Sequence, residues 1–288
     1  MTSRQFGRSN SLNIYHTVSA AREPVVDLRR RGKTTALVPT MGALHEGHRR
    51  LIQQASLHHD AVFVSIFVNP TQFAAGEDLQ TYPRPIEHDL EVCRQLGVAG
   101  VFCPDEATMY PAGTTTSIGP PSVAEPLEGV HRPGHFGGVC TVVAKLLGIL
   151  PTDAAYFGKK DYQQWAVIAA MVRDLNIPTQ IIGCEIIRDT DSLALSSRNV
   201  YLSEHERRTA LAIPATLNRV VTKWRGGNRD IDQLQSFMAA ELSATDLQYA
   251  TIRDARTFGD PIPGNLAVAL IATRVGTTRL IDNVELHP

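Results

Sequence analysis

The sequence predicts an α/β fold in which a doubly wound parallel sheet is followed by a smaller C-terminal α+β domain. Strand-like and helix-like segments alternate as far as about residue 187, an order typical of a parallel sheet with helices on both faces. One strand-like run, residues 61–68 (AVFVSIFV), is apolar almost without interruption, which indicates a strand covered on both faces. Beyond residue 187 the order changes to two helices followed by strands. The predicted domains are therefore residues 1–187 and 188–288, with a boundary region near 186–200.

The N-terminal elements follow from the spacing of apolar residues. Leu51, Ile52 and Ala55 fall on one face of a helix that begins near residue 47. In a sheet of this kind, ligands bind beyond the carboxyl ends of the strands, at the point where the strand order reverses. The expected elements, in chain order, are a helix that ends at 29–31, a strand at 35–38, a helix from 47, a strand at 61–68, a helix at 86–96, a strand at 98–103, a helix from about 136, a strand at 154–157, a helix around 165–175 and a strand at 180–187.

The C-terminal elements begin with the pattern of a capping box at residues 203–206 (SEHE). The helix that it opens is expected to run through Trp224, with a kink at Pro214. A second helix and three strands follow. The helix carries Leu234, Phe237, Met238 and Leu242 in phase, and the strand-like runs lie near 247–252, 268–273 and 278–286.

Composition and charge exclude several classes of protein. Lys and Arg total 28 against 29 Asp and Glu, so the net charge of -1 gives no general attraction to nucleic acid or to an anionic membrane. The four cysteines form no CxxC pair, which is typical of reduced thiols in a cytoplasmic protein rather than of a zinc site. No apolar stretch is long enough to span a bilayer. We expect a soluble cytoplasmic protein whose polar residues 1–11 are a disordered tail and not a signal peptide.

The segment with the most chemical content is residues 39–48 (PTMGALHEGH), at the junction of a strand and a helix. The backbone N–H groups and the dipole of a helix N-terminus favour phosphate. Gly47 lets the backbone approach a ligand, and the imidazoles of His45 and His48 can donate hydrogen bonds to the charge that develops as pyrophosphate leaves. The alternative is a pair of surface histidines, and a metal site lacks a third ligand at suitable spacing. The segment therefore indicates nucleotidyl transfer.

Two further polar clusters follow predicted strands. Residues 158–161 (GKKD) offer two lysines that can neutralise a phosphate, and Asp161 can cap a helix or bind ribose hydroxyls. Residues 195–199 (LSSRN) join the two domains and offer two hydroxyls and a guanidinium for phosphate oxygens. Taken alone, each cluster also fits a simple polar turn or linker. Because all three clusters fall at strand ends in a doubly wound order, a shared nucleotide site is the favoured interpretation.

Four segments together resemble the pantothenate synthetase family, the pantoate:beta-alanine ligases of the HxGH nucleotidyltransferase superfamily. They are residues 39–48 (PTMGALHEGH), 64–73 (VSIFVNPTQF), 158–164 (GKKDYQQ) and 195–202 (LSSRNVYL), and the resemblance spans roughly residues 30–288 in order. It implies a Rossmann-like N-terminal domain, a smaller C-terminal lid domain and a homodimer. It also implies that ATP and Mg²⁺ support a condensation of pantoate with beta-alanine through pantoyl adenylate, which gives pantothenate, AMP and pyrophosphate.

The resemblance further implies roles for individual residues. His48 is expected to be the proton donor, with His45 assisting at the phosphates. Gln72, Gln164 and Met41 are expected to bind pantoate and beta-alanine, because neutral amides can hydrogen-bond hydroxyls and a carboxylate without a buried ion pair. A catalytic set for the triphosphate would consist of Lys160, Ser196, Ser197 and Arg198. The expected ATP-binding residues are Met41, Gly42, Ala43, Leu44, His45, Glu46, Gly47, His48, Gly158, Lys159, Lys160, Asp161, Ile187, Leu195, Ser196, Ser197 and Arg198.

The sequence departs from the family pattern at several positions. Lys159 stands where Glu is common in the family, Leu195 where Met is common and Ser192 where Gly is common. The Lys159 charge is expected either to tighten ATP binding or to face solvent. An acidic stretch common in the family is represented by residues 87–89 (EHD), which makes Asp89 the candidate Mg²⁺ ligand, with ATP and water supplying most of the coordination.

Two other interpretations stay open at this point. An adenylyl- or cytidylyltransferase that makes a nucleotide cofactor would share the HxGH segment, but it should carry basic residues in place of Gln72 and Gln164. A relative that only binds nucleotide or a partner protein is suggested by the departures at His88, Lys159 and Ser192. For the implied homodimer, residues 64–68 are the expected intersubunit edge.

Overall fold

The computed structural model describes residues 12–74, 77 and 79–288, so the predicted tail at 1–11 lies outside the described residues. The chain divides into two compact units, each taken by itself below. The first contains the chain up to Gly119 with Gly134–Phe157 and Met171–Cys184, and the second contains Pro120–Pro133, Gly158–Ala170 and Glu185–Pro288. Two early segments thus belong to the C-terminal unit, whereas the sequence divides the chain once, after residue 187.

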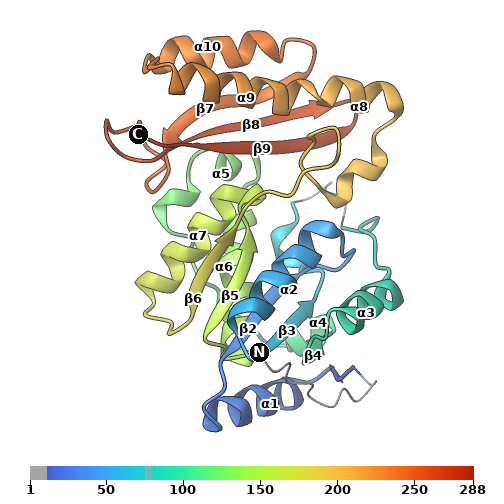
Figure 1. Ribbon diagram of the computed structural model, residues 1–288. Helices are drawn as coiled ribbons and strands as arrows, with labels where there is room; N and C mark the ends of the chain where they lie inside the picture. Colours follow the sequence, from blue (N-terminus) through green and yellow to red (C-terminus); the bar gives the residue numbers. More distant parts are fainter. Residues whose placement is uncertain (1–11, 75–76, 78) are drawn as a thin grey trace, which may run out of the picture. The chain divides into compact units, whose positions relative to one another are not determined.

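The first unit is built on a six-stranded sheet whose strand order reverses in the middle (Figure 1). The order is β1 (Ile14–Tyr15), β4 (Gly100–Phe102), β3 (Ala61–Ile66), β2 (Thr35–Thr40), β5 (Ala154–Gly158) and β6 (Gln180–Cys184). The pairs β1–β4, β4–β3, β3–β2 and β2–β5 are parallel. Apart from the short edge strand β1, chain order runs outward from β2 through β3 and β4 on one side and from β5 to β6 on the other, so the switch point lies between β2 and β5. The predicted doubly wound sheet is confirmed.

Helices connect the parallel strands of the sheet, because a parallel pair needs a crossover connection. The helices that connect β2 to β3 and β3 to β4 are α2 (Glu46–His58) and α3 (Ile86–Gln95), and both share one apolar cluster with these strands. α2 buries Leu51, Ile52 and Ala55, as the spacing predicts. The chain returns to β5 through α6 (His135–Ile149), which packs against α1 (Val18–Arg30). The remaining helices of the first half are α4 (Glu106–Met109), α5 (Glu128–His131) and α7 (Tyr162–Asp174).

Strand β3 is apolar because it lies inside the sheet. It pairs in register with β2 on one side, from Ala61 opposite Thr35 to Ile66 opposite Thr40, and with β4 on the other. Both rows of backbone groups are therefore occupied by neighbouring strands. Within the expected intersubunit segment 64–68, Val64 and Ser65 are therefore paired on both sides and have no free edge, whereas residues 67–68 lie beyond the end of β3.

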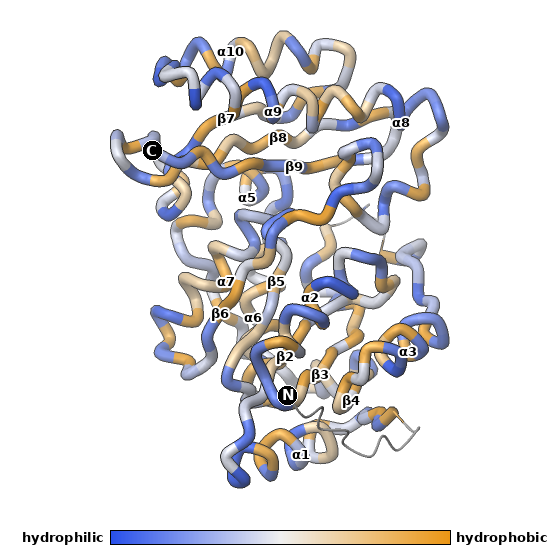
Figure 2. The backbone as a smooth tube through the Cα atoms, viewed as in Figure 1, coloured by the Kyte–Doolittle hydropathy of each residue, from blue (hydrophilic) through white to orange (hydrophobic). Residues whose placement is uncertain are grey.

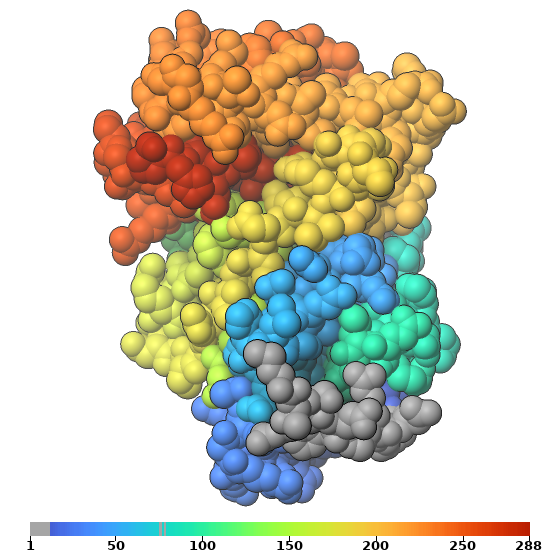
Figure 3. Space-filling model, in the orientation of Figure 1, coloured from blue at the N-terminus to red at the C-terminus, as the bar shows by residue number. Residues whose placement is uncertain are grey.

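The second unit contains an antiparallel sheet of three strands in the order β7 (Asp246–Asp254), β8 (Ala267–Val275) and β9 (Thr278–Leu286). These are the three strand-like runs that the sequence predicts. α9 (Ala212–Arg225) and α10 (Ile231–Glu241) share an apolar core with this sheet. Hydrophobic and hydrophilic residues are interspersed along both helices (Figure 2), and both helices form part of the face seen in Figure 3. The helical residues buried in that core include Leu217, Val220, Trp224, Leu234 and Met238.

The helix that the capping box opens is shorter than the sequence predicts. Ser203 and Glu206 form the box, but α8 (Glu204–Ala210) ends at once and α9 begins at Ala212. Pro214 is the physical reason. It has no N–H for the Ala210 carbonyl, and its ring crowds that oxygen, so the chain breaks at Leu211 instead of kinking within one long helix.

Ser192 has a left-handed backbone, with φ at 77°. It lies in a tight turn closed by a bridge between Arg188 and Ala194, and its N–H donates to the Asp189 carbonyl at 2.8 Å. A residue with a Cβ adopts this conformation at a cost of about 1–2 kcal/mol, whereas glycine adopts it freely. The turn geometry thus accounts for glycine being the residue that suits this position.

Replacing Ser192 with Gly is expected to stabilise the protein. Because the serine is exposed and the turn already suits glycine, the relief of strain should exceed the entropy that glycine adds to the unfolded chain, for a net gain of about 0.5–1 kcal/mol. Thermal unfolding should show Tm higher by about 2 °C. Ser236→Gly is the matched control, because Ser236 is exposed in the middle of α10 and its replacement should lower Tm. A lower Tm for Ser192→Gly would contradict the strain argument.

Candidate active site

The HxGH segment leaves the carboxyl end of β2 at the switch point of the sheet. The chain turns sharply there, because Gly42 and Ala43 both have left-handed backbones, with φ of 85° and 51°. Thr40 steadies the start of the turn: its hydroxyl donates to the Ser65 carbonyl of the neighbouring strand and accepts from the Gly42 N–H. The turn brings the chain directly into α2 at Glu46.

Asp89 holds this turn from α3. Its Oδ2 accepts the Ala43 N–H at 2.8 Å and its Oδ1 accepts the Leu44 N–H at 2.7 Å, and the side chain is buried. Burial raises the pKa of the Asp89 carboxyl, although the two N–H groups act in the opposite direction. Both carboxylate oxygens are thus engaged in shaping the loop that carries the histidines. Asp89 was expected from the sequence only as a metal ligand.

His45 and His48 cap α2 reciprocally. The Nδ1 of His45 accepts the Gly47 N–H at 3.1 Å, and the Nδ1 of His48 accepts the His45 N–H at 3.3 Å. Their ring centroids lie 4.1 Å apart. Since each Nδ1 accepts, the proton of each neutral ring lies on Nε2, so both imidazoles carry a donor at the opposite side of the ring from the cap.

Gly47 is needed for this arrangement. A Cβ at Gly47 would come within 2.8 Å of Cε1 and 2.9 Å of Nδ1 of His45. The sequence predicts that this glycine gives a ligand access to the backbone. In the structure it also leaves room for the His45 ring over the first turn of the helix.

Gln72 lies in a buried polar cluster after β3. It ends the short 3₁₀ helix Pro70–Gln72, and its side-chain amide contacts both Asn69 and the Sδ atom of Met41. The structure therefore brings together two of the three predicted substrate residues, Met41 and Gln72. Asn69, only 1% exposed, was missed. The sequence NPTQ could have indicated it, because a turn that begins at an Asn-Pro pair places residues three apart on one side.

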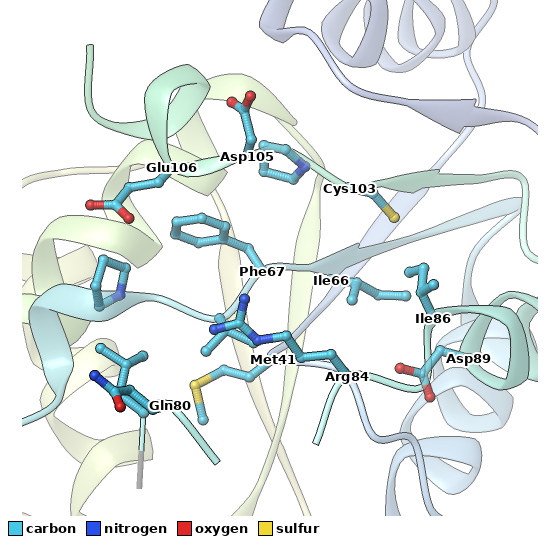
Figure 4. A pocket seen from close by; sticks show the side chains of 15 residues that line it. Met41, Ile66, Phe67, Gln80, Arg84, Ile86, Asp89, Cys103, Asp105 and Glu106 are labelled. Carbon is cyan, nitrogen blue, oxygen red and sulfur yellow. The ribbon is translucent and has the colours of Figure 1, made fainter. Parts of the chain in front are cut away.

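A cavity of about 520 Å³ opens beside Met41 at the carboxyl ends of β2, β3 and β4 (Figure 4). Its wall is largely apolar, and its polar groups include Arg84, Asp89 and Glu106. Met41 is the predicted site residue that this cavity shares with the cluster around Gln72. The lining residues are Met41, Gly42, Ile66, Phe67, Val68, Pro70, Leu79, Gln80, Arg84, Ile86, Asp89, Cys103, Pro104, Asp105 and Glu106.

In the second unit, the ammonium of Lys159 is paired with carboxylates. It donates to Glu185 and to Glu285, each at 2.9 Å, and lies 5.7 Å from the centre of the Trp165 ring. Burial lowers the pKa of this ammonium, but the hydrogen bonds to the two carboxylates outweigh burial, and the pKa is raised. Lys159 therefore keeps its charge, and that charge is directed at Glu285, whose Oε1 also accepts from the Tyr162 hydroxyl.

The turn of residues 158–161 is fixed through its backbone. The side chain of Asn283 in β9 donates to the carbonyls of Lys159 and Lys160, both at 2.9 Å. Lys160 is half-buried and Asp161 is exposed. Gln164, one turn into α7, is half-buried, whereas its neighbour Gln163 is buried and bonds the segment Val123–Glu128.

The segment of residues 187–198 is held by ion pairs and by its own backbone. The Leu195 N–H donates to the Ile187 carbonyl at 2.9 Å, so these two predicted ATP residues are adjacent. Ser196 caps the 3₁₀ helix Ser197–Tyr201 by accepting the Arg198 N–H. Arg188 forms two hydrogen bonds with the buried Asp282, at 2.6 and 2.9 Å. These contacts fix the backbone on which Ser197 and Arg198 stand.

The predicted site residues thus fall into two groups, one in each unit. Within the first unit the structure gathers Met41, Gly42, Ala43, Leu44, His45, Glu46, Gly47, His48, Gln72 and Asp89 at the carboxyl edge of the sheet. The second unit carries Gly158, Lys159, Lys160, Asp161, Gln164, Ile187, Leu195, Ser196, Ser197 and Arg198.

Comparisons with known proteins give a consistent result over almost the whole chain. A family described as pantoate-beta-alanine ligase matches residues 13–285. A pantothenate synthetase from Rhodopirellula baltica is 52% identical over 281 residues, covering 96% of this chain and 99% of that protein. The crystal structure of pantothenate synthetase from Thermus thermophilus aligns with a TM-score of 0.89 at 37% identity, covering 96% of this chain and 100% of that one. A pantoate-beta-alanine ligase from Francisella tularensis, complexed with beta-gamma ATP and beta-alanine, aligns with a TM-score of 0.79 at 35% identity, covering 95% and 97%.

Proposed function

This chain belongs to the pantoate-beta-alanine ligase family, and we propose how its residues carry out the reaction. The protein is a ligase that condenses pantoate with beta-alanine at the expense of ATP. In the proposed route, the pantoate carboxylate attacks the α-phosphate of ATP, which releases pyrophosphate and forms pantoyl adenylate. The amine of beta-alanine then attacks the acyl carbon, and AMP leaves as pantothenate forms.

The observation that carries this proposal is the reciprocal cap of His45 and His48. Each ring is fixed through Nδ1, so Nε2–H is the donor that it can offer to a phosphate oxygen. The N-terminus of α2 adds its dipole at the same point. We assign to His48 the N–H donor to the leaving pyrophosphate, in place of the expected proton donor, and assistance at the phosphates to His45.

The second unit supplies the remaining ATP contacts in this proposal. Lys160, Ser196, Ser197 and Arg198 bind the triphosphate, because an ammonium, two hydroxyls and a guanidinium stabilise charge on phosphate oxygens. Gly158, Asp161 and Ile187 contact the adenosine. Lys159, by contrast, contributes through the backbone of the turn, since two carboxylates already engage its ammonium.

Gln72, Gln164 and Met41 are assigned to pantoate and beta-alanine. The support for Gln72 is that its amide is buried and already held in one orientation, so little side-chain entropy is lost when it binds a substrate oxygen. Met41 supplies an apolar contact beside it.

Mg²⁺ fits this site as an ion carried by ATP. Among the described residues there is no group of three His, Cys, Asp or Glu side chains that could hold a metal. Asp89, the expected ligand, would have to bind the ion with the lone pairs left by two backbone N–H groups. Magnesium commonly takes most of its ligands from phosphates and water, and its chemistry here would be to neutralise charge on the triphosphate.

A homodimer and a cytoplasmic location are further parts of the proposal, and they rest on the family resemblance. In the described part of the chain, no helix combines the length and the apolar character needed to cross a membrane. Residues 63–65 of β3 are paired on both sides, so they do not supply a strand edge to a dimer.

Dependence of pyrophosphate release on the acceptor tests the proposed reaction. With ATP, Mg²⁺ and pantoate, pyrophosphate should appear without beta-alanine, and pantothenate should form only after beta-alanine is added. Omitting pantoate is the control and should abolish release. Release that requires a phosphorylated acceptor in place of pantoate would contradict the assignment and would favour a nucleotidyltransferase.

A further inference from the structure

Asn69, Gln72 and Tyr110 form a chain of hydrogen bonds in which the orientation of both side-chain amides can be assigned. The Tyr110 hydroxyl lies 2.7 Å and the Thr71 hydroxyl 3.0 Å from Oδ1 of Asn69. Nδ2 of Asn69 donates to Oε1 of Gln72 at 3.2 Å, and Nε2 of Gln72 donates to Sδ of Met41 at 3.0 Å.

The direction of this chain is fixed at Asn69. Nδ2 of Asn69 also lies 3.3 Å from the Gly138 carbonyl, which can only accept, so the atom that faces Gly138 must be the nitrogen. The oxygen of Asn69 then faces Tyr110 and Thr71 and accepts from their hydroxyls, of which Tyr110 is the nearer. The two hydroxyls also lie 3.3 Å from each other, where either can be the donor. Burial raises the pKa of Tyr110, so its hydroxyl stays protonated at neutral pH.

The orientation of Asn69 fixes that of Gln72 in turn. Because Asn69 presents its NH₂ group, the Gln72 atom that meets it must be the oxygen, and a flipped Gln72 would set two NH₂ groups against each other. The backbone of Gln72 is held as well, since Nδ1 of His135 donates to its carbonyl at 2.8 Å. Gln72 is left with its own NH₂ group directed toward Met41.

That NH₂ group of Gln72 can readily donate a hydrogen bond to a substrate. A thioether sulfur is a weak acceptor, so an oxygen can replace Sδ of Met41 at little cost. The group that Gln72 offers is a donor, and it therefore selects an acceptor oxygen, as in a carboxylate or a hydroxyl.

We propose that Tyr110 is a positioning residue for pantoate: together with the Gly138 carbonyl on the other side of the Asn69 amide, it holds the orientation of Asn69 and thereby the polarity of the Gln72 amide, so that the Gln72 N–H is offered to an oxygen of the substrate. This inference rests on the proposed assignment of Gln72 to pantoate. In this proposal Tyr110 does not itself contact the pantoate carboxylate or the α-phosphate of ATP. Its ring is held separately, by packing against Phe67 at 6.2 Å between centroids and by the Lys145 ammonium at 5.6 Å.

Tyr110→Phe tests this proposal, because it removes one hydroxyl and leaves the ring contacts in place. The variant loses the shorter of the two hydrogen bonds to Oδ1 of Asn69. This loss should raise KM for pantoate about five- to tenfold, whereas KM for ATP and kcat should change less than about twofold. Tyr110→Phe/Thr71→Val, which removes both donors, should raise KM for pantoate further. Tyr15→Phe is the control, because Tyr15 lies on the edge strand β1, and it should leave all constants unchanged.

A double-mutant cycle with Gln72→Ala shows whether Tyr110 acts through Gln72. If it does, Tyr110→Phe should have no further effect on KM for pantoate in the Gln72→Ala background. The proposal is overturned if Tyr110→Phe leaves KM for pantoate within about twofold, if its effect persists undiminished in the Gln72→Ala background, or if KM for ATP rises equally. A Gln72→Ala variant with unchanged KM for pantoate would instead overturn the assignment of Gln72, and this inference with it.

Discussion

Replacing His48 with alanine is expected to lower kcat by about a hundred- to thousandfold, the range seen when one donor to a developing charge is removed. The reason is specific to the ring orientation. With Nδ1 accepting the His45 N–H, His48 presents Nε2–H as its donor, and alanine supplies none. Steady-state formation of AMP measures the loss, and KM for pantoate should change little, because the lost interaction strengthens as pyrophosphate leaves.

His48→Ala also removes half of the cap of α2, so a second variant must separate catalysis from folding. Losing a cap costs about 1 kcal/mol. His48→Gln keeps the cap, because glutamine at this position of a helix can accept the same backbone N–H, yet it lacks the imidazole. It should retain the wild-type Tm and show a loss of kcat similar to that of His48→Ala. His58→Ala, at the exposed end of the same helix, is the matched control and should be fully active. If either His48 variant stayed within about threefold of wild-type kcat, His48 would not be the donor.

The parts of the fold that follow from local sequence were predictable. The strand at 35–38 and the helical face of Leu51, Ile52 and Ala55 place the HxGH segment at a strand end, and the structure confirms this. The three strands of the second unit also appear where β-branched runs predict them. Predicted strands were too long where backbone pairing, rather than residue type, sets the end: β4 begins at Gly100 and β6 ends at Cys184.

The contacts that shape the site could not be predicted, because they join residues distant in sequence. Lys159 forms a hydrogen bond with Glu285, which lies 126 residues further along the chain. Because of this contact, the Lys159 ammonium is paired with a carboxylate. The reciprocal cap of α2 was missed for another reason. The usual capping box has Ser or Thr and then Glu or Gln three residues later, whereas here histidines occupy both positions. The HxGH motif indicated only a catalytic role for His45 and His48, although the same two side chains also cap α2.

Asp89 is the most consequential of these distant contacts, and its replacement by asparagine is expected to lower kcat/KM for ATP about a hundredfold. An ionised carboxylate accepts both the Ala43 and the Leu44 N–H. Asparagine has a single oxygen, so its NH₂ group would face the second N–H, and a buried donor would be left without an acceptor at a cost of about 1–3 kcal/mol. The turn at Gly42 and Ala43 has two left-handed residues in succession. In the variant it would lose one of the two hydrogen bonds to residue 89 that hold it in place before His45.

Magnesium dependence distinguishes this loss from the loss of a metal ligand. If Asp89 bound Mg²⁺, raising the ion well above its wild-type saturating level should restore much of the activity of Asp89→Asn. If Asp89 holds the loop, activity should stay low at every Mg²⁺ concentration, and Tm should fall because one backbone N–H is no longer satisfied. Glu87→Gln, an exposed carboxylate two residues away on α3, controls for the general effect of removing a charge and should behave like wild type. The two hydrogen bonds of the Asp89 carboxylate are buried and short, at 2.7 and 2.8 Å, and a bound Mg²⁺ would have to compete with them for the same oxygens. We therefore expect the activity of Asp89→Asn to stay low at every Mg²⁺ concentration.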